Sequence, residues 1–267
     1  MTVPTYVYAF EDGDGRNKLL LGGKGANLCV MTQLGLAVPP GFVITTEACL
    51  AYLADGRPPP GMLEQVRAHI TALEAKTGKR FGDPSRPLLV SVRSGSAMSM
   101  PGMMDTILNL GLNDDTAAAL ARLTDNPRFA YDAWRRFIQL FGKIAMGLPD
   151  EPFDHALAAL RRRVGAAQDV DLSADDLRGL CAEYAAIYQA GVGAAIPTDP
   201  YAQLELAIGA VFRSWMGKRA VDYRRQFRIT PEMANGTAVN VCTMVFGNMG
   251  NDSGTGVGFT RNPGTGE

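Results

Sequence analysis

The residues best suited to chemistry are an arginine and the loop of small residues that follows it. Apolar and β-branched residues over 88–92 predict a buried strand, which leads through Arg93 into the loop Ser94–Gly102. Backbone N–H groups of such a loop form a concavity for phosphate oxygens, and a guanidinium adds two parallel charge-assisted hydrogen bonds. The segment is typical of an anion-binding site, although composition alone fits a surface turn before a hairpin equally well.

A cluster of methionines belongs to the same stretch: Met98, Met100, Met103 and Met104. Methionine is flexible and apolar, so the cluster suits a surface that adapts to a planar ligand. Gap filling in a core explains it equally well, and both interpretations stay open.

A lysine among glycines is the second candidate. Gly22, Gly23, Lys24 and Gly25 precede a predicted helix over 26–34, and a lysine at a helix start can reach a phosphate that the helix N-terminus already favours. The stretch is not a P-loop, because glycine rather than serine or threonine follows the lysine. Glycine-rich turns also precede helices without any ligand, so this signal is weaker on its own.

Composition narrows the class of partner. The chain has 267 residues, a net charge of −1 and a pI near 6.2, which offer no electrostatic case for nucleic acid or an anionic membrane. The four cysteines are widely spaced, and both histidines lie in helical patterns among charged residues, so neither a metal site nor a catalytic histidine is predicted. Without a membrane-spanning segment or a signal-peptide pattern, we expect a cytoplasmic protein with a small-molecule partner.

The elements that must position these residues change in kind along the chain. Strands, helices and loops alternate over 1–112, which is typical of an α/β-type lobe. Periodic apolar patterns over 113–198 predict helices alone. We therefore expect an α+β fold in which an all-helical subdomain is inserted into the lobe.

The last part of the chain is expected to return to sheet. A long helix is predicted within 199–236, and six cations between Arg213 and Arg228 favour a solvated helix face over a phosphate funnel. Strands predicted over 238–246 and 256–260 would then begin a second lobe, which covers 237–267.

Several stretches resemble the N-terminal nucleotide-binding domain of the pyruvate, phosphate dikinase family. They read SVRSGSAMSMPGMMDTILNLGLND, GGKGANL, PPGFVITTEA, WRRFIQLFG and AVFRSWMGKRAVDYRRQF, and together they extend over nearly the whole chain. The resemblance implies an incomplete ATP-grasp fold that binds ATP with Mg²⁺.

The resemblance also implies roles for particular residues. Lys24 and Arg93 would neutralise phosphate charge, and Cys242 stands where a polar residue is usual in the family, so that only main-chain contacts to adenine are expected from this strand. The implied cofactor-binding residues are Lys24, Arg93, Ser94, Gly95, Ser99, Gly102, Asp105, Thr106, Thr243, Met244, Val245, Gly254 and Thr255.

By the same resemblance we expect a truncated chain. The metal ligands of the family would lie beyond residue 267, and no residue here matches the catalytic phosphohistidine. The implied function is the ATP-binding portion of a dikinase that converts ATP, phosphate and pyruvate to AMP, diphosphate and phosphoenolpyruvate. Partner chains would carry the phosphohistidine and pyruvate-binding domains, and a homodimer fits the full-length family. The alternatives are a phosphoenolpyruvate synthase-like fragment, a non-catalytic nucleotide-binding module, or an unstable fragment.

Overall fold

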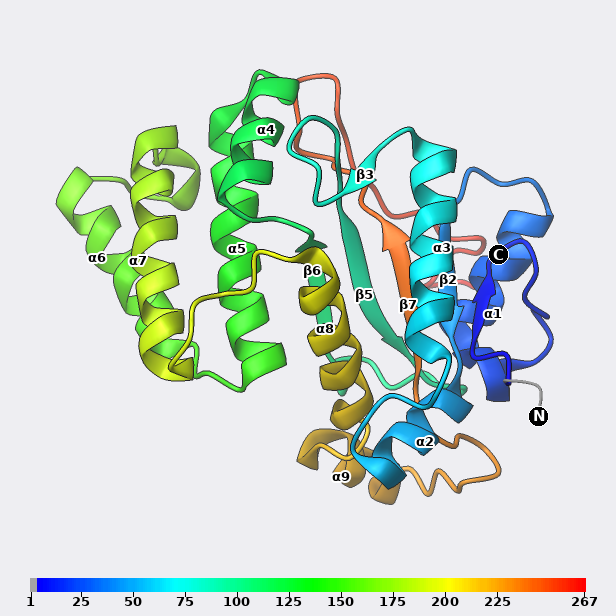
Figure 1. The fold of residues 1–267 in the computed structure, drawn as a ribbon. Helices are drawn as coiled ribbons and strands as arrows, with labels where there is room; N and C mark the ends of the chain where they lie inside the picture. Colours follow the sequence, from blue (N-terminus) through cyan, green and yellow to red (C-terminus); the bar gives the residue numbers. More distant parts are fainter. Residues whose placement is uncertain (1–3) are drawn as a thin grey trace.

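A computed structural model describes residues 4–267 and places a five-stranded antiparallel sheet at the centre of the molecule (Figure 1). The strand order is β1-β2-β7-β5-β6, so the last strand of the sequence lies in the middle of the sheet. A separate two-stranded parallel ladder joins β3 to β4. The strands are β1 Val7–Ala9, β2 Gly41–Ile44, β3 Arg80–Phe81, β4 Pro87–Leu88, β5 Val90–Gly95, β6 Thr106–Leu110 and β7 Ala238–Thr243.

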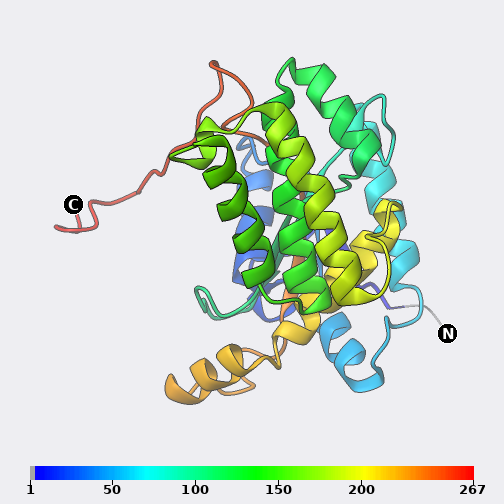
Figure 2. The same cartoon turned by 90° about the vertical axis from the view of Figure 1, so that its left-hand side faces the viewer.

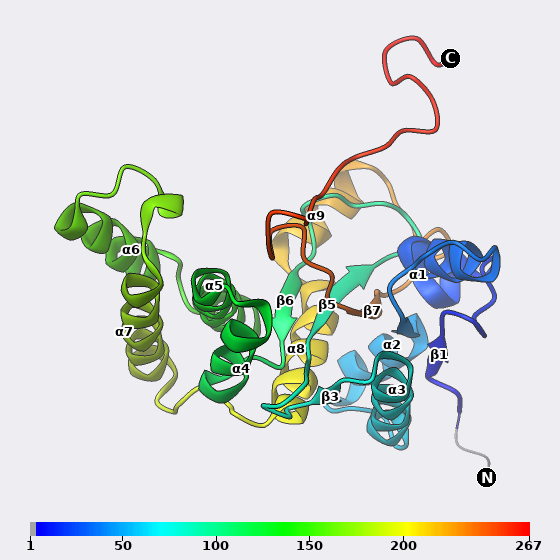
Figure 3. The ribbon, with the colours of Figure 1, turned by 90° about the horizontal axis from the view of Figure 1, so that it is seen from above.

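Helices cover both faces of the sheet. On one face, α1 (Lys18–Gln33) packs against β2, β5 and β7; on the other lie α2 (Thr46–Asp55), α3 (Met62–Thr77) and α8 (Pro200–Ser214) (Figure 3). Strand alternation produces this division, because successive side chains of a strand point to opposite faces. In β2, for example, Val43 joins the small cluster under α1, while its neighbours join the main core.

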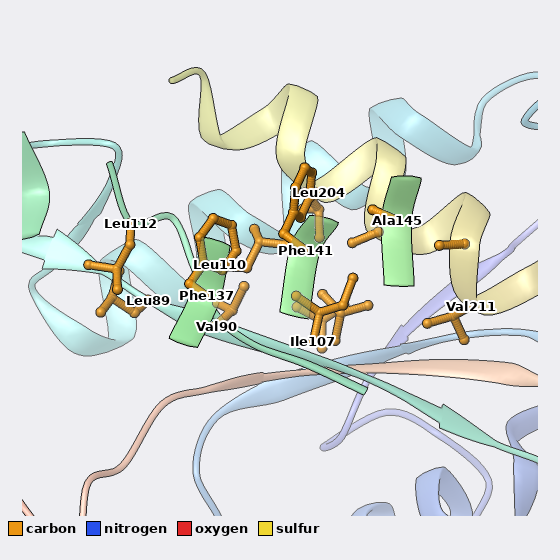
Figure 4. Packing of buried hydrophobic residues seen from close by; sticks show 14 of the residues in the cluster. Leu89, Val90, Ile107, Leu110, Leu112, Phe137, Phe141, Ala145, Leu204 and Val211 are labelled. Atoms are coloured by element: carbon orange, nitrogen blue, oxygen red, sulfur yellow. The ribbon is translucent and has the colours of Figure 1, made fainter. Parts of the chain in front are cut away.

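The main core lies where α5 (Pro127–Met146) and α8 cross the sheet. Ile107 of β6 is fully buried together with Phe137 and Phe141, which belong to α5, and Figure 4 shows these side chains packed beside Leu204 of α8. The apolar stripe predicted along α5 therefore serves core packing, as its 3.6-residue period indicated.

All secondary structure between 113 and 198 is helical, as predicted. Next to α5 lie α4 (Asp114–Thr124) and α7 (Ala174–Val192), and α6 (Glu151–Val164) packs against α7 farther from the sheet (Figure 3). Buried Arg135 of α5 contacts Asp132 at 2.8 Å and Asp169 at 3.2 Å, which ties the short helix η1 (Asp169–Asp171) to α5. The mixed helix and sheet confirm the α+β fold class; the ATP-grasp assignment and the segment boundaries near residues 112 and 198 stay predictions.

The prediction of a single long helix within 199–236 is wrong. The chain forms α8 and then a separate helix α9 (Lys218–Gln226), with a turn over 215–217 between them. Of the six cations predicted to form a solvated helix face, five are exposed and Arg224 is half-buried. Arg224 lies over the ring of Trp215, 3.8 Å from its centroid, and Arg219 contacts the loop between β5 and β6.

The predicted strands at the C-terminal end are also corrected. β7 ends at Thr243, and it pairs with β2 on one side and β5 on the other, so it belongs to the first sheet and does not begin a second lobe. The described residues form no strand over 256–260; the segment beyond β7 runs away from the sheet (Figures 2 and 3), and Val257 and Phe259 are exposed. An alternating pattern requires a partner strand, and none lies beside this one.

No helix within residues 4–267 is both long enough and apolar enough to span a bilayer.

Candidate functional site

A cleft of about 640 Å³ opens between α1 and the loop that joins β5 to β6. Its walls consist of small residues, methionines and two lysines, Lys18 and Lys24. It is lined by Lys18, Gly23, Lys24, Asn27, Leu28, Met31, Ser94, Gly95, Ser96, Ala97, Met98, Ser99, Met100, Pro101, Gly102, Met104 and Thr106.

A break in α1 shapes the floor of this cleft. Gly22 has a left-handed φ of 68° and a non-helical ψ of 161°, so a new helical run starts directly after it. The N–H of Gly23 donates to the carbonyl oxygen of Ser96 at 2.8 Å. The helix thus begins at Lys18 rather than at the predicted residue 26, but Lys24 does lie in the first turn of the run after the break. The helix N-terminus faces the cleft, where its dipole favours an anion.

Two neighbours of Lys24, Arg93 and Cys242, set the electrostatics of the cleft together with it. Partial burial, and then the nearby guanidinium of Arg93, lower the pKa of Lys24 below its usual range. Cys242 of β7 lies in the same neighbourhood: burial raises its thiol pKa to about 11, while Arg93 and Lys24 oppose that rise. Two cations so close together are stabilised by a bound anion, so the cleft is built to accept negative charge.

Two buried polar atoms beside the cleft lack hydrogen-bond partners in the part of the chain that the structure describes. They are Oγ of Ser96, whose residue is only 5% exposed, and Oδ1 of Asn240, which is completely buried. The Asn240 amide nitrogen donates to the Arg93 carbonyl oxygen at 3.4 Å. Because a buried unpaired hydroxyl is costly, Ser96 is a donor that a ligand in the cleft would satisfy.

The two ends of the loop are held by the backbone. Ser96 accepts from Gly23 at the start, and Ser94 N–H donates to the Asp105 carbonyl oxygen at 3.4 Å at the end. Arg219 of α9 contacts the second half of the loop, with Nη1 3.2 Å from the Gly102 carbonyl oxygen and Nη2 3.0 Å from Asp105 Oδ1.

The structure brings most of the predicted phosphate-binding residues together. Arg93 and Asp105 border the cleft without lining it. Ser94 and Gly95 lie in β5 and not in the loop as predicted, because β5 continues its ladder with β7 as far as the pair Gly95 and Ala238. The predicted residues that line the cleft are Lys24, Ser94, Gly95, Ser99, Gly102 and Thr106.

The residues predicted to contact adenine are not brought to this cleft. The N–H groups of Thr243 and Met244 already donate to the carbonyl oxygens of Pro40 and Leu89, and Val245 is 73% exposed. Further along the chain, the predicted residues Gly254 and Thr255 lie in the exposed segment beyond β7.

Sequence reasoning missed several residues of the site. Ser96 was passed over inside a serine-rich loop, and Asn27 and Met31 could have been found from their spacing of one helical turn from Lys24 and from each other. Asn240 gave a weak signal as a lone polar residue in an apolar strand. Arg219 gave none, since only the fold brings it to the loop.

The described residues do not offer a site for a metal ion. No group of three or more histidine, cysteine, aspartate or glutamate side chains gathers anywhere in residues 4–267. The carboxylate nearest the cleft, Asp105, is paired with Arg219. These side chains alone therefore do not form a metal site; a magnesium ion bound together with ATP would also take oxygen ligands from the phosphates and from water.

Comparison with known proteins identifies the domain. The family model described as the pyruvate phosphate dikinase AMP/ATP-binding domain matches residues 18–58 and 59–267. By this match, the class of the chain is an AMP/ATP-binding domain. It belongs to the pyruvate phosphate dikinase AMP/ATP-binding domain family.

Its curated relatives are much longer proteins. The pyruvate, phosphate dikinase of Entamoeba histolytica is 62% identical over 262 residues, which cover 98% of this chain and 30% of that protein. The enzyme of Giardia intestinalis is 53% identical over 248 residues, covering 93% of this chain and 28% of the relative. The enzyme of Clostridium symbiosum is 51% identical over 264 residues, 98% of this chain and 30% of the relative. The chain thus spans less than a third of the length of these relatives.

Proposed function

We propose that the cleft binds the phosphate groups of ATP, with Lys24 and Arg93 neutralising their charge and the 96–105 loop covering them. The observation that carries this proposal is the meeting of the helix start at Gly23 with the small-residue loop, around two neighbouring cations. Each cation stabilises a phosphate oxygen. A bound anion favours the charged form of Lys24 and so raises its lowered pKa toward the usual range. The family membership supports the same ligand.

The overall reaction is part of this proposal. The named activity of the relatives suggests that the domain supplies ATP to a dikinase, which transfers phosphoryl groups to phosphate and pyruvate to give AMP, diphosphate and phosphoenolpyruvate. Phosphoryl transfer relies on positioning and charge stabilisation, and the cleft offers both for the phosphate chain. We assign Mg²⁺, the phosphohistidine and the pyruvate site to domains outside these 267 residues.

A cytoplasmic location is proposed together with this function. Its support is chemical: all four cysteines are free thiols, and three of them are buried. Free buried thiols are usual in a reducing compartment.

The proposal is tested by titrating the chain with ATP and measuring the dissociation constant by calorimetry. Lys24→Ala and Arg93→Ala are each expected to weaken binding at least about tenfold, because each removes a charge-assisted contact to phosphate. Lys79→Ala, which removes a lysine outside the cleft, is the matched control and should bind like the unaltered chain. A chain that does not bind ATP, or one whose affinity is unchanged in Lys24→Ala, overturns the proposed site. Binding without turnover identifies a domain that needs its partners.

A further inference from the structure

The loop between β5 and β6 is held to the rest of the molecule by very few hydrogen bonds. Between residues 97 and 104, the Met103 N–H donates to the Met100 carbonyl oxygen at 3.2 Å, which is a contact within the loop. In the described part of the chain, Arg219 alone donates to these residues from outside, at Gly102. Apolar packing is supplied by the buried Met100 and by the half-buried Met103 and Met104, which contact the main core. Arg219 therefore makes the polar contact between the described chain and the half of the loop after Met100.

The contact that Arg219 makes is forked. One guanidinium nitrogen donates to the Gly102 carbonyl oxygen at 3.2 Å, and the other lies 3.0 Å from the Asp105 carboxylate. Gly102 has a left-handed φ of 73°, and Asp105 immediately precedes β6, so the fork spans the return of the loop to the sheet. A planar guanidinium matches two acceptors at a fixed separation, whereas an ammonium group acts as a single point charge.

Arg219 reaches the loop because the chain changes direction between α8 and α9. The turn over 215–217 redirects the chain, and α9 starts at Lys218. Arg219 thus lies in the first turn of a short helix that runs close to the loop, while Arg225 near its other end approaches only Asp222, at 3.9 Å. The change of direction between α8 and α9 therefore brings the first turn of α9, with Arg219, to the loop.

The geometry points to Arg219 as the positioning residue of the nucleotide-covering loop. Its fork fixes the Gly102 carbonyl and the Asp105 carboxylate, and through them the wall of the cleft formed by residues 99–104. Arg219 itself does not line the cleft. This inference rests on the proposed function for its effect on ATP, but the ordering of the loop by Arg219 does not.

The energetics predict where the effect of Arg219 should be seen. Its side chain is 64% exposed and that of Asp105 is 26% exposed, so the ion pair contributes little to global stability. The free energy of local opening of the loop depends on the few contacts that hold it, and not on the stability of the whole molecule. Removing the fork should therefore alter loop order and ligand affinity without altering the cooperative melt.

Four variants test this: Arg219→Ala, Arg219→Lys, Asp105→Asn and, as the control of equal charge on the same helix, Arg225→Ala. Amide hydrogen exchange of residues 97–105 is measured without nucleotide, and ATP affinity and thermal melts are measured on the same samples. We expect Arg219→Ala to exchange about two- to fivefold faster and to bind ATP more weakly by a similar factor. Arg225→Ala should match the unaltered chain, and all melts should stay within about 2 °C of it.

The remaining variants separate geometry from charge. Arg219→Lys should resemble Arg219→Ala in loop exchange, and Asp105→Asn combined with Arg219→Ala should add less than the sum of the two single effects. Unchanged exchange in Arg219→Ala, or full loop order in Arg219→Lys, overturns the positioning role whether or not ATP binds. Faster exchange with unaltered ATP affinity overturns the link to the ligand. A chain that fails to bind ATP at all refutes the proposed function, and hydrogen exchange alone then decides the role of Arg219.

Discussion

Gly22 packs so closely against the backbone of Gly95 that it cannot carry a side chain, and Gly95 in turn is confined by Asn240. A methyl group on Gly22 would lie 1.9 Å from the carbonyl oxygen of Gly95, and one on Gly95 would lie 2.7 Å from the amide nitrogen of Asn240. This approach brings the start of the second helical run of α1 against the end of β5. Lys24 is held at the mouth of the cleft by backbone contact rather than by side-chain packing.

Gly22→Ala is expected to destabilise the chain by at least about 2 kcal/mol, since it combines a strained φ of 68° with the clash against Gly95. Gly56→Ala is the matched control: Gly56 has a φ of 69° but no atom within 4 Å of an added methyl group, so only the backbone cost of about 1 kcal/mol applies. Urea denaturation gives both free energies of unfolding. Equal losses in the two variants would show that the close approach is not rigid.

Ser96→Ala should weaken ATP binding about tenfold while leaving the thermal melt unchanged or slightly raised. The hydroxyl is buried without a partner, so its removal costs the free protein nothing, whereas a charge-assisted bond to phosphate is lost in the complex. Calorimetric titration beside Ser85→Ala, an exposed serine outside the cleft, checks this result. An unchanged affinity would mean that a water molecule, and not the ligand, satisfies this hydroxyl.

Lys24→Met should stabilise the nucleotide-free chain near pH 7, by about 2 °C or less in melting temperature. The folded state lowers the pKa of Lys24 below the usual 10.5, so the folded chain holds this proton less tightly than the unfolded chain. The cost of the charged lysine is present below the folded pKa and disappears as the pH rises toward 10.5. Melts from pH 6 to 10.5 should show the two proteins converging at high pH; a gap that widens with pH would contradict the argument.

Alkylation of Cys242 reports on the same cations. Its thiol pKa of about 11 predicts slow reaction with iodoacetamide at neutral pH and a rate that rises through pH 10, because the thiolate is the reactive form. Lys24→Ala removes a charge that favours the thiolate, so it should slow the reaction at pH 9. Mass spectrometry of the Cys242 peptide distinguishes it from the other three thiols. A faster reaction in this variant would place Lys24 as a steric shield and not as an electrostatic neighbour.

Much of the fold could be predicted from local pattern. The stripe of α5 and the β-branched run of β5 have strong periodicity, and the structure contains both elements close to their expected bounds. The first turns of α1 were missed because Gly22 and Gly23 are typical of a loop, while the structure uses Gly22 only to break the helix. The gap between α8 and α9 was missed because Trp215 and Met216 continue an apolar pattern through the turn.

The residues of the candidate site likewise divide into those that local sequence patterns predict and those that only the fold brings into place. Lys24 and Ser99, for example, could be predicted because each lies in a short motif whose residue types suit phosphate binding. Asn240 and Arg219 could not, since each reaches the cleft region from a distant part of the chain, and their roles depend on strand register and on the direction of one short helix. The strand predicted over 256–260 has the right alternation but no partner in the described chain.

The position of β7 has a consequence for how the chain folds during synthesis. β1 and β2 form one half of the sheet and β5 and β6 the other, and in the described residues only β7 joins them. A ribosome therefore exports more than 230 residues, with the whole helical region among them, before the strand that unites the halves emerges. Until then both halves expose edges that can pair with other chains. Formation of the cleft between α1 and the β5–β6 loop is thus a late event, and chaperones that shield strand edges should matter more for this protein than its many local helices suggest.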